Sequence, residues 1–230
     1  MDYQEEYINK NPNMHLEDSL LKVDQISLVI PPKFKAKSLL DVACGAGLVT
    51  VKVAEKLNSR YNVGIDISRT MINKAKKVDK DRLVNWKMSD VFNYNTKNKF
   101  DLILCVDILE HVENDLEFLK KVGQLGKYIV IKTPLEKSMF SRLLVKLKIF
   151  DPWKDTEKRY GHVQHYDEKN LDELFRQSNL TIVNSVSVPM PRRSKLVWEI
   201  FRLLFYPISI LSMDKMVKIS GGFKIVLLKS

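Results

Sequence analysis

The chain has 230 residues, of which 45% are hydrophobic and 29% charged, and its formal net charge is +10 at pH 7. This length suffices for one large domain with a substantial core, and the composition excludes collagen-like, disordered and disulfide-rich classes. The longest apolar runs are shorter than the roughly 20 residues of a membrane-spanning helix, and the polar first residues are not expected to act as a signal peptide. We therefore expect a cytoplasmic protein, with a peripheral position on the inner face of the membrane as an alternative.

Positive charge is concentrated in the second part of the chain. Residues 1–136 carry 21 Lys/Arg and 19 Asp/Glu, whereas residues 137–230 carry 17 Lys/Arg and 9 Asp/Glu. A basic surface indicates an anionic partner, such as nucleic acid, a phosphorylated substrate or a lipid surface. A generally lysine-rich composition without such a partner is the alternative.

Apolar residues at helical spacing predict an amphipathic helix over residues 14–30, which Pro31 and Pro32 end. Beyond it, short apolar runs alternate with helical patterns, which predicts a parallel sheet with helices on both faces. Ser68 and Asp167 are expected to cap two of the helices, because their side-chain oxygens can accept hydrogen bonds from free N–H groups. The expected strands cover 38–43, 61–66, 83–89, 99–105, 127–133, 180–188 and 223–229, and the expected helices cover 48–58, 69–78, 113–122 and 168–178.

A glycine turn follows the first expected strand. Gly45 and Gly47 stand between the strand over 38–43 and the helix over 48–58. Glycines let the backbone turn sharply and let a ligand approach closely, and the helix then points its free N–H groups at that ligand. Asp66 ends the next strand, where an acid can hold the two hydroxyls of a ribose. The pattern predicts a nucleoside-containing cofactor at the first strand–helix turn of an open α/β sheet.

The residues around the turn indicate which cofactor it binds. The dinucleotide fingerprint needs a third glycine where Thr50 stands. Asp41, just before the turn, would repel a pyrophosphate but suits a ligand that carries an ammonium and a sulfonium. Asp90 follows the strand over 83–89 and could accept a hydrogen bond from an adenine amino group. An NAD-dependent oxidoreductase is therefore a distant alternative.

Four segments occur in an order and spacing that resemble a known family. The chain is similar to class I S-adenosylmethionine-dependent methyltransferases, in particular the small-molecule branch that includes ubiquinone-biosynthesis-like, type 11 methyltransferases. The resemblance covers roughly residues 38–133 and extends weakly to 161–166 and the last strands. The segments are Asp41-Val-Ala-Cys-Gly-Ala-Gly, Gly64-Ile-Asp-Ile-Ser, Ser89-Asp90 and Phe100-Asp-Leu-Ile-Leu-Cys-Val-Asp-Ile-Leu-Glu-His-Val.

The resemblance implies a fold and a cofactor. The fold is a seven-stranded, mostly parallel Rossmann-like sheet of order 3-2-1-4-5-7-6, with helices on both faces and an added helical lid. Residues 1–230 would then form a single methyltransferase domain with an N-terminal helical cap over 1–32. The cofactor is S-adenosylmethionine. By resemblance, Asp41, Gly45 and Gly47 surround its methionine part, Asp66 holds the ribose, and Asp90 and Val91 frame the adenine. Ile67 is a further cofactor-binding residue, and Val106 lies beside the cofactor.

Two segments, 134–166 and 189–222, exceed the minimal plan of such a sheet. Both leave the carboxyl ends of parallel strands, so we expect them to form a basic, apolar lid over the site together with the N-terminal cap. Within them, 139–153 and 196–213 combine apolar and aromatic residues with Lys and Arg. These stretches could lie in a membrane interface, or they could pack on the domain or on a second subunit of a homodimer.

Transfer of a methyl group to a hydroxyl is helped by a general base, and histidine suits that role near neutral pH. His111 follows the fourth strand, and His162 and His165 lie in Gly161-His-Val-Gln-His-Tyr, just before the last predicted helix. Similar segments of the family line the cofactor and acceptor side, so the resemblance implies His111, His162 and His165 as catalytic candidates, with a structural or solvent-exposed role as the alternative for each. His15 is a weaker candidate.

A metal site is not expected. The Cys and His residues lack zinc-finger spacing, and although Asp107 resembles the first acid of catechol-type enzymes, the Asp-Asn pair that those enzymes carry is replaced by Lys132-Thr133-Pro134. Cys44 and Cys105 are expected to be reduced and buried.

These observations favour methylation, most simply at oxygen, of a small-molecule, sugar or lipid-linked acceptor. An RNA methyltransferase is an alternative that would explain the positive charge. However, no RNA-binding module is visible, and the motif of base-methylating enzymes is replaced by Cys105-Val-Asp-Ile, so nucleic acid is not the expected partner. An inactive scaffold that only binds the cofactor is a further alternative.

Overall fold

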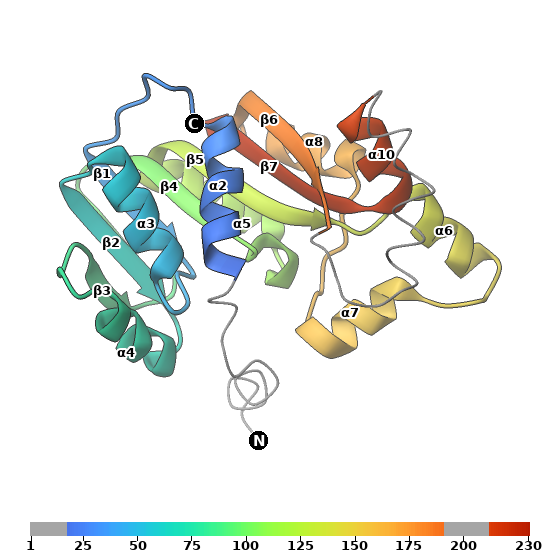
Figure 1. Ribbon diagram of the computed structural model, residues 1–230, viewed down its shortest axis with the longest axis horizontal. Helices are drawn as coiled ribbons and strands as arrows, with labels where there is room; N and C mark the ends of the chain where they lie inside the picture. The colour runs from blue at the N-terminus through green and yellow to red at the C-terminus, as the bar shows by residue number, and fades with distance from the viewer. Residues whose placement is uncertain (1–17, 191–211) are drawn as a thin grey trace.

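The computed structural model describes residues 18–190 and 212–230, which form a seven-stranded sheet with helices on both faces (Figure 1). The strand order is β3-β2-β1-β4-β5-β7-β6, as predicted. Neighbouring strands from β3 to β5 are parallel, and β7 lies antiparallel between β5 and β6. The strands are β1 (Ser38–Val42), β2 (Tyr61–Asp66), β3 (Asn85–Met88), β4 (Phe100–Val106), β5 (Gly126–Leu135), β6 (Thr181–Pro189) and β7 (Gly222–Lys229).

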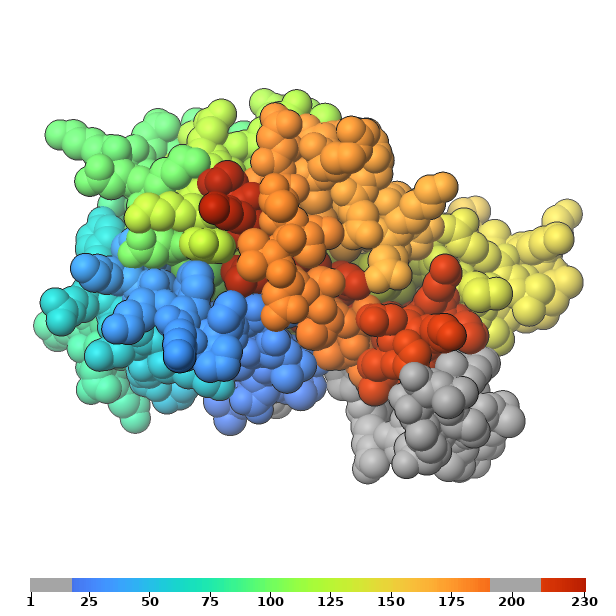
Figure 2. Space-filling model, turned by 90° about the horizontal axis from the view of Figure 1, so that it is seen from above, coloured from blue at the N-terminus to red at the C-terminus, as the bar shows by residue number. Residues whose placement is uncertain are grey.

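Helices cover both faces of the sheet. The α2 and α3 helices pack on one face, and α5 and α8 pack on the other. Asn184 Nδ2 of β6 donates to the Val29 carbonyl at the end of α2 (3.1 Å), and Figure 2 shows the blue residues of α2 beside the orange residues of β6. The helices are α2 (Ser19–Val29), α3 (Leu48–Leu57), α4 (Arg69–Val78), the 3-10 helix η2 (Leu109–His111), α5 (Asp115–Leu125), α6 (Met139–Lys146), α7 (Pro152–Tyr160), α8 (Glu168–Gln177) and α10 (Met213–Ser220).

Alternation of side chains along the central strands builds both layers of the core. On β4, Ile103 and Cys105 face the α5–α8 layer, whereas Leu102 and Leu104 face the α2–α3 layer, and all four are fully buried. A strand buried on both faces needs apolar residues at consecutive positions. This requirement explains why the strands could be located from apolar runs rather than from alternating ones.

The predicted boundaries hold to within a few residues. Ser68 and Asp167 cap their helices, as predicted: the Ser68 side chain accepts from Met71 N, and Asp167 forms a capping box with Asn170. The β5 strand is longer than expected, because its pairing with β7 continues from Tyr128 to Leu135. The Asn114 side chain caps α5, so this helix begins at Asp115 rather than at 113.

The two expected lid segments are helical where they are described. Segment 134–166 folds into α6 and α7, which lie together at one end of the molecule beyond β5 (Figure 1). Of segment 189–222, α10 is described, while 191–211 lie outside the described residues. The same holds for 1–17 of the N-terminal cap, which include His15. No helix within 18–190 and 212–230 is long and apolar enough to cross a bilayer.

Cys44 and Cys105 are both free and buried, as predicted. Burial raises the pKa of each thiol, and the nearby Asp41 carboxyl adds to the effect. The two thiols therefore stay protonated at neutral pH.

Replacing Gly47 with alanine is expected to lower the free energy of unfolding. Gly47 has a φ of +83°, and a Cβ there would lie 2.6 Å from Trp86 Cη2 and 2.7 Å from Ala75 Cβ. Left-handed strain and overpacking together should cost about 2–4 kcal/mol, measured by urea unfolding.

Gly45→Ala is the matched control. Its φ is +54°, but a Cβ there would meet nothing within 4 Å, so only the backbone strain of about 1–2 kcal/mol should appear. Equal losses of stability in the two variants would contradict the packing role of Gly47.

Candidate active site

The carboxylate of Asp66 fixes the glycine turn (residues 43–47) at the carboxyl edge of the sheet. Its Oδ2 accepts from Gly45 N (2.9 Å), and its Oδ1 accepts from Ser68 N (2.8 Å). Burial raises the pKa of Asp66, and these two N–H groups partly offset the rise. The sequence therefore placed Asp66 correctly beside the turn, although it did not predict this direct bond to Gly45.

Asp41 lies beneath the same turn and is buried. Its Oδ2 accepts from Thr50 Oγ1 of α3 (2.5 Å). Burial raises the pKa of Asp41 to about 7, against the lowering effect of the Thr50 hydroxyl. Thr50, which breaks the dinucleotide fingerprint, thus has a positive role, because its hydroxyl satisfies a buried carboxyl that would otherwise be unpaired.

Open space beside the turn lies at Gly45, not at Gly47. A Cβ at Gly45 would meet nothing within 4 Å, whereas Trp86 and Ala75 fill the corresponding space at Gly47. A side chain at Gly45 would therefore project into a space next to Asp66 that a ligand could use. That Gly47 also contacts a ligand remains a prediction.

The other predicted cofactor residues differ in exposure. Ile67 and the Asp90 side chain are exposed, and Asp90 Oδ1 accepts from Phe92 N (2.9 Å). The Val91 side chain is buried in the α5–α8 layer of the core, and Val106 is partly buried against the α2–α3 layer. The side chain of Val91 is therefore occupied by packing, and the ligand roles of all four residues stay predictions.

Asp107 lies directly after β4 in a left-handed conformation, with a φ of +54°. Its carboxylate pairs with Lys132 of β5 and with Lys22 of α2 (2.9 Å to Lys22). Burial alone would raise the pKa of Asp107, but the two ammonium groups outweigh it and hold the pKa at about 2. Lys132 Nζ also lies 3.6 Å from the ring centroid of Phe223. These ion pairs connect α2 to the ends of β4 and β5, and the two lysines balance the negative charge of the Asp107 carboxylate.

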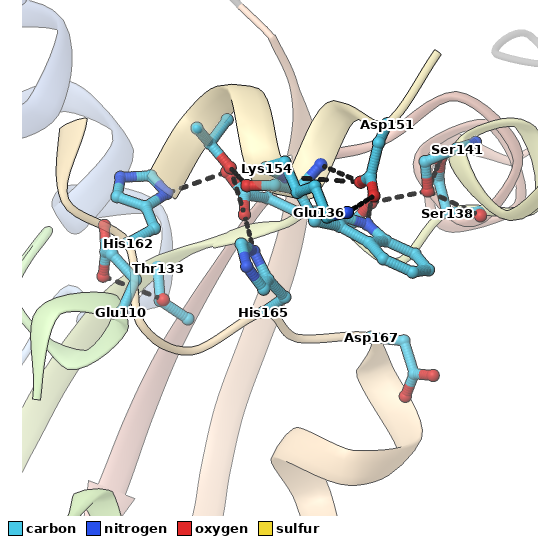
Figure 3. A network of polar contacts seen from close by, with 12 residues as sticks. Glu110, Thr133, Glu136, Ser138, Ser141, Asp151, Lys154, His162, His165 and Asp167 are labelled. Atoms are coloured by element: carbon cyan, nitrogen blue, oxygen red, sulfur yellow. Dashed lines mark hydrogen bonds and ion pairs between the residues drawn. The ribbon is translucent and has the colours of Figure 1, made fainter. Parts of the chain in front are cut away.

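The carboxylate of Glu136, which follows β5, contacts two of the predicted catalytic histidines (Figure 3). Its Oε1 lies 2.8 Å from His162 Nδ1, and its Oε2 lies 2.5 Å from His165 Nδ1. The Glu136 side chain is only 7% exposed. Burial would raise its pKa, but the His162 contact, followed by that of His165, reverses the shift and lowers the pKa. Glu136 is therefore an ionised, buried acceptor for both rings.

The remaining predicted histidine joins this group from η2. The rings of His111 and His162 meet edge to face, with centroids 4.9 Å apart. His111 Nδ1 lies 3.2 Å from the Gly161 carbonyl, and burial, with the charge of His162, lowers the pKa of His111. The structure therefore brings together His111, His162 and His165, which come from two segments about 50 residues apart. Their catalytic role stays a prediction.

Glu110 is buried beside these rings. Its Oε2 accepts from Thr133 Oγ1 (3.1 Å), and burial, followed by the charge of Asp107, raises its pKa to about 7. Among the described residues, Glu110, His111 and His162 offer donor atoms within 4.8 Å of one another, which is where a metal ion would find ligands in this chain. Both imidazole Nδ1 atoms are engaged by other partners, and that no metal binds here stays the prediction.

Sequence reasoning missed Glu136, Lys132 and the hydrogen-bonding role of Thr50. Lys132 had a usable signal, because a single lysine inside the apolar run of β5 must find a buried partner. Glu136 had a weaker one, as the first acid after β5 at the edge where the histidines were expected. Its pairing with two histidines 26 and 29 residues further along the chain depends on the tertiary fold.

A cavity of about 740 Å³ lies away from these groups, between α6, α8 and α10. Its charged lining is balanced: Lys137, Arg142, Lys169, Arg176 and Lys218 face Asp167, Glu168, Asp172, Glu173 and Asp214. The balance favours neither an anionic nor a cationic ligand.

Comparison with known proteins agrees with this geometry. Residues 15–185 match the model of a family described as a methyltransferase domain. The chain belongs to this family. It is also 33% identical over 97 residues to a ubiquinone biosynthesis O-methyltransferase of Coxiella burnetii, a match that covers 40% of this chain and 40% of that relative.

Solved structures share the fold at low sequence identity. An S-adenosylmethionine-dependent methyltransferase from Mesorhizobium loti superposes with a TM-score of 0.60 and 18% identity, over 89% of this chain and 95% of that one. The magnesium protoporphyrin IX methyltransferase from Synechocystis, solved with bound SAH, gives a TM-score of 0.60 and 13% identity, over 100% of this chain and 88% of that one. The cofactor of this methyltransferase-family chain is accordingly S-adenosylmethionine, and the glycine turn beside Asp66 is its predicted position.

Asp66→Asn is expected to weaken binding of S-adenosylhomocysteine at least tenfold, measured by calorimetry. The substitution removes a charge-assisted acceptor, which typically contributes about 1.5–3 kcal/mol.

Asp101→Asn is the matched control, because Asp101 Oδ2 likewise accepts from two backbone N–H groups, those of Lys37 and Ser38 (2.9 and 3.2 Å), but at the opposite edge of the sheet. The affinity of Asp101→Asn for S-adenosylhomocysteine should equal that of the unmodified chain. Unchanged affinity in Asp66→Asn would remove Asp66 from the cofactor site.

Proposed function

We propose that this chain methylates a hydroxyl oxygen of a small-molecule acceptor, with His162 as the general base and Glu136 as its positioning residue. S-adenosylmethionine, when bound, supplies a methyl carbon made electrophilic by a sulfonium. The leaving group is neutral, so the chain's main tasks are to align the acceptor, exclude water and take up one proton.

The observation that carries this proposal is the Glu136–His162 contact. Because Glu136 is ionised, it can only accept, so His162 must place its proton on Nδ1. The other ring nitrogen, Nε2, is then unprotonated and can take the acceptor's hydroxyl proton. The imidazolium that forms keeps its hydrogen bond to Glu136. Burial lowers the pKa of His162, but Glu136 more than offsets this, so the pKa is raised.

His162 suits the role better than its two neighbours. Its ring contacts His111 of η2, directly beyond β4, whereas His165 stacks obliquely on Trp153 of α7, with centroids 6.3 Å apart. His111 Nδ1 faces a carbonyl rather than a carboxylate, and burial, followed by the charge of His162, lowers its pKa despite the opposing charges of Asp107 and Glu136. His111 and His165 would then shape the acceptor pocket and help to exclude water.

The O-methyltransferase relative supports transfer to oxygen. The match covers less than half of that relative, so the acceptor is named here only by class: a small molecule whose hydroxyl can reach His162. A labelled-methyl assay on a cell extract, fractionated into small metabolites, lipids, glycans and RNA, tests this directly. Label in the small-metabolite or lipid fraction is expected, and label confined to RNA would contradict the proposal.

His162→Gln and Glu136→Gln are each expected to lower turnover on the labelled fraction by about 100-fold or more, because general-base catalysis typically contributes that much. Affinity for S-adenosylhomocysteine should not change, since neither side chain contacts the glycine turn. Both values come from one preparation, by radiometric assay and calorimetry.

Glu157→Gln is the matched control, because Glu157 is exposed on α7 and its side chain forms no hydrogen bond or ion pair with the residues that the structure describes. It should keep full turnover, and turnover of the unmodified chain should survive EDTA. Full activity in His162→Gln, or complete loss in EDTA, would contradict His162 as the base.

A further inference from the structure

The α6 helix leaves a row of large apolar side chains in solvent. Met139, Leu143 and Leu147 recur every four residues, so they lie on one side of the helix, and Ile149 and Phe150 continue the row in the following turn. All five are exposed, from 48% for Leu143 to 68% for Ile149. Ser141 is the buried residue of this helix. We call these five residues the α6 patch.

Positive charge borders the α6 patch. Arg142 and Lys146 lie on the neighbouring side of the helix, and Lys148 stands between Leu147 and Ile149 in the turn. Arg142 is paired with Asp167, whereas Lys146 and Lys148 have no acidic partner among the described residues. The segment 134–166 as a whole carries seven basic and four acidic residues. The combination of exposed apolar side chains with unpaired lysines is complementary to an anionic lipid surface.

The geometry allows contact with such a surface but not insertion across it. The α6 helix has eight residues, about 12 Å of helix, which is far less than a bilayer's thickness. It lies at one end of the molecule, where Figure 2 shows the yellow residues projecting beyond the sheet. Trp153, which the sequence grouped with this surface, instead turns inward, and its Nε1 donates to the Glu136 carbonyl (3.2 Å). The surface is therefore 139–150, shorter than the predicted 139–153.

The α6 patch is joined to the catalytic group through Glu136. Ser138 caps α6 only two residues after Glu136, and Ser141 Oγ donates to the Glu136 carbonyl (2.6 Å). The same residue thus orients His162 with its carboxylate and anchors α6 with its main chain. A surface that contacts lipid at α6 would lie next to the group that accepts the proton.

We propose that the α6 patch binds an anionic phospholipid surface and that the acceptor is an amphiphilic or lipid-linked hydroxyl compound that reaches His162 from that surface. The second clause rests on the proposed function, while the first does not. A second copy of this chain is a poorer occupant, because a two-fold contact between α6 patches would bring together the positive charges that border both patches.

Flotation of the full chain with vesicles tests the surface. Vesicles of phosphatidylcholine and phosphatidylglycerol in equal parts should bind the chain at low salt, whereas phosphatidylcholine alone should bind it at least about tenfold more weakly. The double substitution Leu143→Gln with Leu147→Gln should reduce binding to the mixed vesicles by about tenfold or more, since two leucines lose their burial in the interface. Lys146→Gln with Lys148→Gln should reduce binding at low salt only.

Leu28→Gln on α2 is the matched control, because Leu28 and Leu147 are equally exposed, at 57% each, and only Leu147 lies in the α6 patch. This variant should bind vesicles as the unmodified chain does. Calorimetry with S-adenosylhomocysteine on every variant shows, without vesicles, whether the variant is folded and binds the cofactor. The vesicle result can therefore be interpreted even if the methyltransferase proposal fails.

Three results would overturn the proposal: no binding of the unmodified chain to the mixed vesicles, equal binding by the Leu143/Leu147 double variant, or a dimer in sedimentation equilibrium that this variant dissociates. The last result would assign the α6 patch to a contact between copies. Loss of vesicle binding with unchanged cofactor affinity would support the lipid assignment.

Discussion

The site depends on one buried carboxylate, that of Glu136. Its two oxygens accept from His162 and His165, and its carbonyl accepts from Ser141 and Trp153. A buried charge without partners would be costly, so the surrounding donors are required for the fold as well as for chemistry. Because these donors come from α6, α7 and segment 161–166, Glu136 holds three parts of segment 134–166 together at the end of β5.

The two parts of the site meet because parallel strands end at the same edge. The β1 and β2 strands supply the glycine turn, Asp41 and Asp66, where we predict that the cofactor binds. The β4 and β5 strands lead to the histidines and Glu136, to which we assign proton uptake in the proposed function. Between them, Asp107 joins Lys132 and Lys22, so the ionic contacts also fix the α2 helix of the N-terminal cap.

The sequence predicted what local patterns control. Strands buried on both faces appear as apolar runs, and Ser68 and Asp167 act within their own helices, so element positions, strand order and both caps were confirmed. His111, His162 and His165 were candidates because their segments resemble those that line the acceptor side in the family. Pairings between distant residues could not be predicted, because no local rule links Glu136 to His162 or Lys132 to Asp107. Gly47 shows the same limit: Trp86 and Ala75, which occupy the space beside it, are distant in the chain.

The position of the imidazole protons tests the central claim most directly. In long-range ¹H–¹⁵N correlation spectra of the chain with labelled histidine at pH 8.5, His162 and His165 should both carry their proton on Nδ1, because the ionised Glu136 accepts from both. The signals can be assigned with His162→Gln and His165→Gln, and Glu136→Gln should convert both rings to tautomer mixtures. A proton on Nε2 of His162 in the unmodified chain would contradict the account, since that ring could not accept a proton from the acceptor's hydroxyl.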